Sequence, residues 1–267
     1  MIKLFVDCVF EGGGIKGLTY VGVLEYFEEN GFQVHKAVGT SVGAIFAALA
    51  VAKFSVKEIK VIIESLDIKT IISRNKFVTS IKGLGMNNIY ELEKKLDEIL
   101  KAKNISTFRD IKFGNDYRLK VVTTDYKLRK EVIIPDDLPK YHIDKDSFKV
   151  SKALAMSACL PLVYSIYEYH NYKFIDGGAT NKFPIELLSN SKNPIVGLKI
   201  GKDNQIIKSF QNKVFKSFNE KKEINNSFII KIDTLGLRAS QFSKGLDNKE
   251  DLYKAGYLSI KNYFRNL

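Results

Sequence analysis

The hydrophobic pattern of the chain alternates between short β-rich runs and longer stretches with helical periodicity. Apolar residues at steps of three and four predict amphipathic helices over 18–30, 56–66, 88–103 and 251–264. Short apolar runs predict strands over 3–10, 33–38, 118–123, 131–134, 172–175, 194–200 and 228–232. This alternation of strands and helices predicts an α/β protein with a mostly parallel central sheet and helices on both faces.

Two further stretches carry apolar residues whose role the pattern leaves open. The stretch 68–85 contains seven large apolar residues, and it is either a lid or a helical excursion. The stretch 205–222 has one apolar stripe at helical spacing, with lysines at other positions, as in helices that lie on anionic bilayers. The alternative for 205–222 is that the stripe packs on the sheet and the lysines are solvated.

Composition is that of an ordinary globular protein, with 45% hydrophobic and 27% charged residues among 267. We find no linker or internal repeat, which predicts a single domain over 1–267, with its motifs in about 3–200 and a strand and helices in 201–267. Cys8 and Cys159 lie in apolar runs, which favours buried free thiols. The pattern contains neither a secretory signal nor a membrane span, so we expect a cytoplasmic protein with peripheral membrane contact as an option.

The formal net charge of +12 indicates either an anionic partner or simply a soluble, lysine-biased surface. Phospholipid surfaces, acidic substrates and nucleic acids are the candidate partners. We find no helix-turn-helix, zinc or RNA-binding signature, so a basic nucleic-acid-binding protein is a remote alternative and no nucleic acid is expected.

A glycine loop, Gly12-Gly13-Gly14-Ile15-Lys16-Gly17, separates the first strand from the first helix. Gly12, Gly14 and Gly17 match the dinucleotide pattern, but the acidic residue required after the next strand is missing. The phosphate-loop pattern fails as well, because Lys16 is followed by Gly17 and Leu18. Free backbone N–H groups in such a loop can instead stabilise an oxyanion.

The segment Gly39-Thr40-Ser41-Val42-Gly43 lies between a short apolar strand and an uncharged helix. A Gly-x-Ser-x-Gly sequence in that setting is typical of a nucleophile elbow, in which the serine hydroxyl projects from a sharp turn. Gly39 and Gly43 then let the strand and the helix approach closely. The alternative is an ordinary helix N-cap formed by Thr40 or Ser41.

A serine nucleophile needs a base, and none of the three histidines is well placed to be one. His35 precedes the serine, whereas His142 and His170 lie in loop-like or turn-like stretches. Asp176 follows the apolar strand 172–175 and precedes Gly177 and Gly178, so its carboxylate is the better candidate. An aspartate that merely belongs to an Asp-Gly turn is the alternative.

The glycine loop, the Gly-x-Ser-x-Gly elbow and Asp176-Gly177-Gly178, in this order, resemble the patatin-like phospholipase family. The stretch Ala155-Met156-Ser157-Ala158-Cys159-Leu160-Pro161 is similar to the family's Ala-x-Ser-x-x-x-Pro segment. The asparagine and proline after the Asp176 motif also fit, and order and spacing agree from about 3 to 200. The resemblance implies a three-layer α/β/α sandwich.

The resemblance also implies a Ser–Asp dyad without histidine, with Ser41 as nucleophile and Asp176 as general base. It assigns the oxyanion hole to the N–H groups of Gly13 and Gly14. Lys16 stands where the family has arginine or lysine, and its charge either supports the loop or is solvated. The implied activity is hydrolysis of phospholipids or related acyl esters without a metal or other cofactor; acyl transfer by the same dyad is the alternative.

Overall fold

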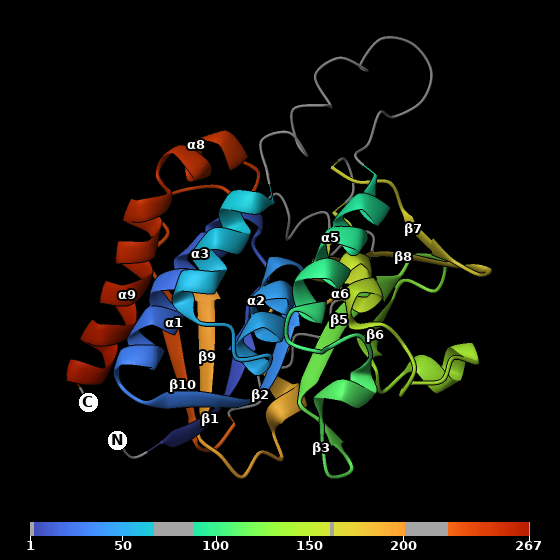
Figure 1. Cartoon of the computed structure of the whole chain (residues 1–267), viewed down its shortest axis with the longest axis horizontal. Helices are drawn as coiled ribbons and strands as arrows, with labels where there is room; N and C mark the ends of the chain where they lie inside the picture. The colour runs from blue at the N-terminus through green and yellow to red at the C-terminus, as the bar shows by residue number, and fades with distance from the viewer. Residues whose placement is uncertain (1–2, 67–87, 161–162, 201–223, 267) are drawn as a thin grey trace.

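The central feature of the computed structural model is an eight-stranded sheet (Figure 1). The structure describes residues 3–66, 88–160, 163–200 and 224–266. The strand order is β10-β9-β1-β2-β5-β8-β7, with β6 paired to β5 outside this path. The strand bounds are β1 Leu4–Phe10, β2 Phe32–Thr40, β5 Leu119–Asp125, β6 Lys130–Ile134, β7 Tyr167–Tyr169, β8 Tyr172–Asp176, β9 Ile195–Ile200 and β10 Ser227–Ile232. A separate two-stranded sheet joins β3 Lys112–Phe113 and β4 Asp116–Tyr117.

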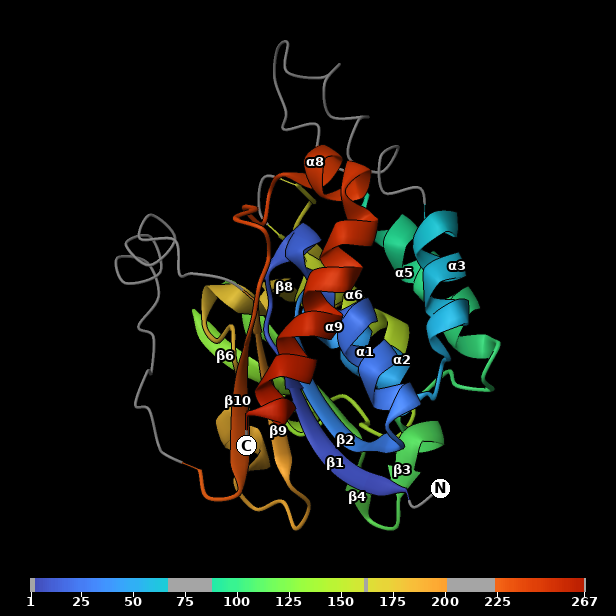
Figure 2. The same cartoon turned by 90° about the vertical axis from the view of Figure 1, so that its left-hand side faces the viewer.

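Most of the helices pack on one face of this sheet. Figure 2 shows α1, α2, α3 and α9 together on that side. The helix bounds are α1 Thr19–Glu29, α2 Val42–Val51, α3 Val56–Ser65, α5 Ile89–Lys101, α6 Val150–Ala158, α8 Phe242–Asp247 and α9 Lys249–Arg265. The 3-10 helices are η1 Gly14–Leu18, η3 Phe108–Ile111, η4 Leu138–Tyr141, η5 Gly177–Ala179 and η6 Ile185–Leu188.

The predicted α/β architecture with a mostly parallel sheet is confirmed. Strands β10, β9, β1, β2 and β5 run parallel to one another. The far part of the sheet is antiparallel, because β6 and β8 both run against β5 and β7 runs against β8. The helix expected over 18–30 begins as the 3-10 helix η1, since the glycine loop has to turn sharply before α1 can start.

Two hydrophobic clusters hold the layers together. The larger one buries the face of the sheet under α1, α2, α6 and α9, and includes the fully buried Phe10 and Tyr20. A smaller cluster on the other face joins Val9 and Val38 to Leu188 of η6. Sheet residues pointing to both sides are therefore covered by apolar side chains, as a parallel sheet requires.

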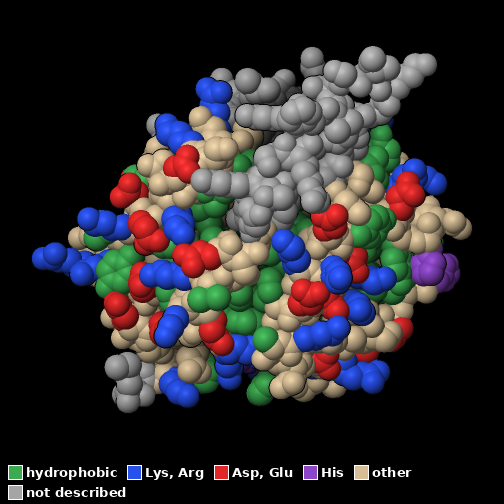
Figure 3. Space-filling model, turned by 45° about the horizontal axis from the view of Figure 1, so that its top comes forward, with side chains coloured by type: hydrophobic (Ala, Val, Ile, Leu, Met, Phe, Trp, Pro, Cys, Tyr) green, Lys and Arg blue, Asp and Glu red, His purple; other side chains and the backbone are tan. Residues whose placement is uncertain are grey.

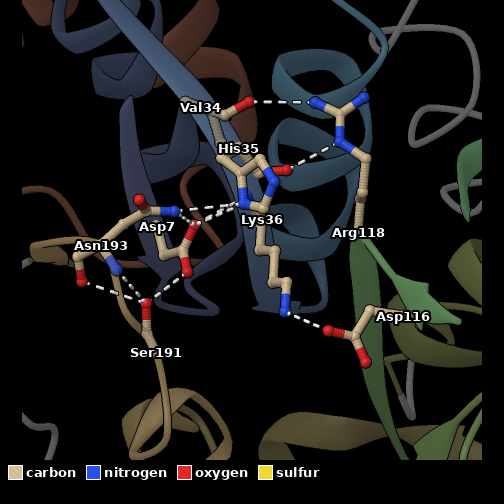
Figure 4. Close-up of polar contacts among 8 residues, drawn as sticks. All are labelled: Asp7, Val34, His35, Lys36, Asp116, Arg118, Ser191 and Asn193. Atoms are coloured by element: carbon tan, nitrogen blue, oxygen red, sulfur yellow. Dashed lines mark hydrogen bonds and ion pairs between the residues drawn. The ribbon is translucent and has the colours of Figure 1, made fainter. Parts of the chain in front are cut away.

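A buried carboxylate ties β1 to its neighbours at the end of the sheet away from Ser41 (Figure 4). Asp7 is 1% exposed. Its Oδ1 accepts hydrogen bonds from the backbone N–H of Lys36 at 2.9 Å and from Nδ2 of Asn193 at 3.1 Å. Ser191 donates to its Oδ2. These contacts satisfy a charge that would be costly to bury alone, and they fix the register of β1 with β2 beside a local irregularity.

The stretches 68–85 and 205–222, whose roles the sequence leaves open, lie outside the described residues. Within the described parts, no helix combines the length and the apolar character needed to cross a bilayer. Figure 3 shows one face of the molecule, on which Lys and Arg side chains are interspersed with Asp and Glu over the described surface. On this face the basic side chains therefore alternate with acidic ones and do not form a separate patch.

Candidate active site

Ser41 occupies a sharp elbow between β2 and α2. Its backbone is in an unusual conformation, with φ 57° and ψ −129°. A Cβ at Gly39 would lie 2.4 Å from the carbonyl oxygen of Gly43, and one at Gly43 would lie 2.3 Å from that of Phe10. Only glycine fits at these two positions, as the elbow interpretation predicts. Ser41 is the N-cap residue of α2 by position, but its side chain makes no capping hydrogen bond. The Thr40 hydroxyl donates to the carbonyl of Asn181 at 2.9 Å, so neither residue of the N-cap alternative caps α2 with its side chain.

The hydroxyl of Ser41 points instead at Asp176. Ser41 Oγ donates to Asp176 Oδ2 at 2.6 Å, although the two residues are 135 positions apart in the chain. Asp176 ends β8 and lies opposite Thr123 of β5 in antiparallel register. Its other oxygen, Oδ1, accepts from the N–H of Gly178 at 2.7 Å, so both carboxylate oxygens have a donor.

Burial changes the acidity of this carboxylate. Asp176 is 4% exposed, and loss of solvent raises its pKa to about 6. The hydrogen bonds from Ser41 and Gly178 and the charge of Lys182 act in the opposite direction, because they favour the ionised form. A carboxylate with this pKa is ionised at neutral pH and is more basic than an ordinary aspartate.

The glycine loop packs against the elbow, since a Cβ at Gly12 would lie 3.4 Å from the Cβ of Ser41. The N–H of Gly12 donates to the carbonyl of Lys182 at 3.0 Å, and that of Ile15 donates to Ala239 at 3.1 Å. Between them, the N–H groups of Gly13 and Gly14 have no acceptor within the described part of the chain. Gly14 adopts φ +56°, which glycine reaches at no steric cost. Among the described residues, two adjacent N–H groups near Ser41 are therefore left without an acceptor.

Lys16 and Glu11 fasten this loop to the last residue of β9. Lys16 is 8% exposed and its Nζ donates to the carbonyl oxygen of Ile200 at 2.6 Å. The Glu11 carboxylate accepts from the N–H of the same residue at 2.6 Å. Burial raises the pKa of Glu11, partly offset by that hydrogen bond and by nearby lysines. Of the two alternatives for Lys16, loop support fits this geometry and solvation does not.

Ser157 was missed as a functional position, although it lies within the family-like segment 155–161. This fully buried residue of α6 accepts a hydrogen bond from the backbone N–H of Ser41 at 2.7 Å. Its own hydroxyl donates to the carbonyl of Val122 at 2.5 Å. Two residues later, the carbonyl of Cys159 accepts from the N–H of Asp176 at 2.9 Å. The end of α6 thus contacts both members of the Ser–Asp pair.

All three histidines lie away from this pair. His35 is in the Asp7 cluster, with its Nδ1 3.2 Å from Nδ2 of Asn193 (Figure 4). It precedes Ser41 on the same strand by six positions, which is roughly 20 Å of extended chain. His142 is the exposed C-cap of η4, and His170 is exposed in the turn between β7 and β8.

An apolar cavity opens beside Ser41. Helices α2, α3 and α5 and the 3-10 helix η1 supply most of its lining, and α6 and α8 add one residue each. Among the described lining residues, only Ser41 and Tyr164 have a polar side chain. Both cysteines are free and buried, as expected.

The fold and the site define an α/β protein in which a serine at a strand–helix elbow pairs with an aspartate beside a glycine loop. A family model described as patatin-like phospholipase matches residues 8–189, which contain all of these motifs. The chain belongs to this patatin-like phospholipase family.

The comparisons with individual proteins agree with this membership. The uncharacterized protein YqhO of Bacillus subtilis (strain 168) is 31% identical over 211 residues, covering 74% of this chain and 72% of YqhO. The probable lipid hydrolase 463L of Invertebrate iridescent virus 6 is 24% identical over 191 residues, covering 69% of this chain and 63% of that protein. The crystal structure of VipD from Legionella pneumophila has a TM-score of 0.58 at 16% identity, covering 99% of this chain and 67% of that one. At that identity, the likeness to VipD concerns the fold alone.

Proposed function

We propose that this protein is a lipid acyl hydrolase that uses Ser41 as nucleophile and Asp176 as general base. The observation that carries the proposal is the 2.6 Å contact between Ser41 Oγ and Asp176 Oδ2 at the elbow. Family membership and the 24% identical probable lipid hydrolase support a lipid ester as substrate. The apolar cavity beside the serine suits the acyl part of such a substrate.

In the first half of the reaction, Asp176 accepts the hydroxyl proton while Ser41 Oγ attacks the ester carbonyl carbon. The negative charge that develops on the carbonyl oxygen lies near the N–H groups of Gly13 and Gly14, which serve as the oxyanion hole. Asp176 then returns the proton to the departing alcohol, and the acyl group remains on Ser41. The raised pKa of Asp176, about 6, suits both the acceptance and the return of this proton.

In the second half, water replaces the alcohol. Asp176 removes a proton from this water as it attacks the acyl carbonyl, and the same N–H groups stabilise the second oxyanion. The collapse of this intermediate returns the proton to Ser41 and releases the fatty acid. Acyl transfer differs only in the acceptor, because a second alcohol would take the place of water; the same pair of residues serves both reactions.

The test compares wild type with Ser41→Ala on a panel of phospholipids, lysophospholipids and neutral acyl esters, with the products identified by mass spectrometry. We expect fatty acid release by wild type only, and serine-directed phosphonate labelling that disappears in the variant. Thermal unfolding of the variant verifies that its fold is retained. Labelling that persists in a folded Ser41→Ala protein would refute the assignment of the nucleophile.

Contact with an anionic membrane surface belongs to the same proposal, since its substrates reside in bilayers and the net charge is +12. We expect binding to vesicles that contain anionic phospholipid and weaker binding as salt rises, because salt screens the charges. Equal sedimentation with neutral and anionic vesicles would remove this part of the proposal.

A further inference from the structure

The cavity beside Ser41 is elongated along α2. Its α2 lining comes from one face of the helix on successive turns: Ser41 and Val42, then Ile45 and Phe46, then Leu49. A helix rises 1.5 Å per residue, so this wall extends about 12 Å from the serine. Beyond Ser41 every one of these α2 side chains is apolar, and Leu49 at the far end is 3% exposed.

The lining supplied by α5 has a similar length. Leu92, Leu96 and Ile99 of α5 are spaced at steps of four and three, which places them on one face over about 10 Å. From α3, Ile62 and Ile63 contribute to the same cavity. Two walls of comparable length along α2 make a slot, and a slot accommodates an extended chain better than a compact ring system.

We propose that this slot holds one unbranched acyl chain of about ten carbons, with the ester carbonyl at Ser41 and the far end of the chain at Leu49. An extended chain advances about 1.2 Å per single bond, as the extended backbone does, so about 12 Å takes about ten carbons. No charged side chain is among the described lining residues, so the head group of a lipid lies outside the slot. The protein therefore selects esters of medium-length acyl chains, and Leu49 sets the length.

This inference rests on the proposed function, in which Ser41 attacks the ester. The experiment measures kcat/KM on p-nitrophenyl esters from two to sixteen carbons, below their micelle concentrations. Each buried methylene contributes about 0.8 kcal/mol, so kcat/KM rises about fourfold per methylene until the slot is full and then stays level. We expect the rise to end near ten carbons in wild type.

Leu49→Trp fills the distal turn of the slot and should end the rise about one helical turn earlier. The loss in kcat/KM should fall on the longer esters, so the ratio of kcat/KM on the four-carbon ester to that on the ten-carbon ester should be higher in the variant than in wild type. Val61→Trp is the matched control, since Val61 lies on α3 beside the slot residue Ile62 but is itself 59% exposed. Leu49→Ala serves if the tryptophan variant fails to fold, and should extend the rise to longer chains.

The outcomes separate this inference from the proposed function. Ser41-dependent turnover with a level chain-length profile, or a Leu49→Trp variant slowed equally on all esters, overturns the slot and leaves the hydrolase intact. The affinity of the Ser41→Ala variant for fatty acids of different length tests the slot without turnover. This affinity should rise about fourfold per methylene up to about ten carbons. Wild type that binds these fatty acids but cleaves no ester would refute the hydrolase and leave the slot standing. Affinity independent of chain length would overturn the slot.

Discussion

The backbone N–H of Ser41 donates a hydrogen bond to the side-chain oxygen of Ser157. Ser157 is fully buried in α6, and its own proton goes to the carbonyl of Val122 in β5. The hydroxyl therefore joins the elbow to the neighbouring strand through a third element. Because Ser41 has a positive φ, a conformation that costs energy outside glycine, this contact helps to hold it.

We expect Ser157→Ala to lower kcat on a soluble ester by about tenfold to a hundredfold, with little change in KM. The reason is that the substitution leaves a buried N–H unpaired, which costs about 1 to 3 kcal/mol and releases the elbow. Phosphonate labelling of Ser41 should slow by a similar factor, and Ser157→Thr should recover part of the loss by restoring the hydroxyl.

Ser151→Ala is the matched control for this prediction. Ser151 is an equally buried serine of α6, but its hydroxyl lies 3.2 Å from Asp97 and does not contact the elbow. It should alter stability without altering kcat. If both alanine variants lose the same activity, or if Ser157→Ala keeps wild-type kcat, the elbow does not depend on Ser157.

The activity should depend on the ionisation of Asp176. Its pKa is raised to about 6 by burial, and only the ionised form can accept the proton of Ser41. We therefore expect kcat/KM on a soluble ester to rise with pH, with a midpoint near pH 6, and to level off above pH 7. A rate that is constant between pH 5 and 8 would contradict this assignment of the base.

The same pKa predicts the effect of Asp176→Asn on stability. An unfolded aspartate loses its proton near pH 4, whereas the folded Asp176 keeps its proton until about pH 6. As the pH rises from 4 to 6, Asp176 therefore lowers the free energy of unfolding progressively, and above pH 6 it lowers it by a constant amount. The difference between the two pKa values corresponds to a loss of about 3 kcal/mol in the free energy of unfolding above pH 6. Asp176→Asn should therefore unfold at higher denaturant concentration than wild type at pH 7, with the advantage gone at pH 4, while losing orders of magnitude in turnover. Equal midpoints at pH 7 would show that burial of this carboxylate costs nothing.

Replacement of His142 or His170 by alanine should leave kcat/KM within about twofold of wild type. Both side chains are exposed, in the C-cap of η4 and in the β7–β8 turn. His35→Gln should reduce stability through the Asp7 cluster (Figure 4) rather than through the chemistry. The check is turnover of a soluble ester beside thermal unfolding, and a folded His142 or His170 variant without activity would reveal a triad.

Much of the fold could be predicted from the sequence because its signals are local. The strand 33–38 extends in the structure to Phe32–Thr40 and the helix 251–264 to Lys249–Arg265, so periodicity located these two elements and missed only their ends. The short elements β7 and α8 were not predicted. The reversed direction of β8 could not be read in this way. It depends on how the chain returns after α6, which no local pattern records.

The residues of the candidate site likewise fall into those that leave a local sequence motif and those that do not. Glycines on either side of Ser41 and after Asp176 leave a motif because steric demands restrict those positions to one residue type. Ser157 and Glu11 leave no comparable signal of their role, since their partners Ser41 and Ile200 are 116 and 189 positions away. A serine in an apolar helix or a glutamate at a strand end has many uses, and only the packed structure distinguishes them.

The end of α6 holds Ser41 through Ser157 and Asp176 through the carbonyl of Cys159. Two reacting groups from distant parts of the chain are thus both bonded to one segment of three residues, 157–159. Because both groups are bonded to the same segment, we expect any shift of that segment to move them together. Redesign of the outer helices to admit other acyl chains can therefore proceed without realignment of the Ser–Asp pair, provided that this short turn is left untouched.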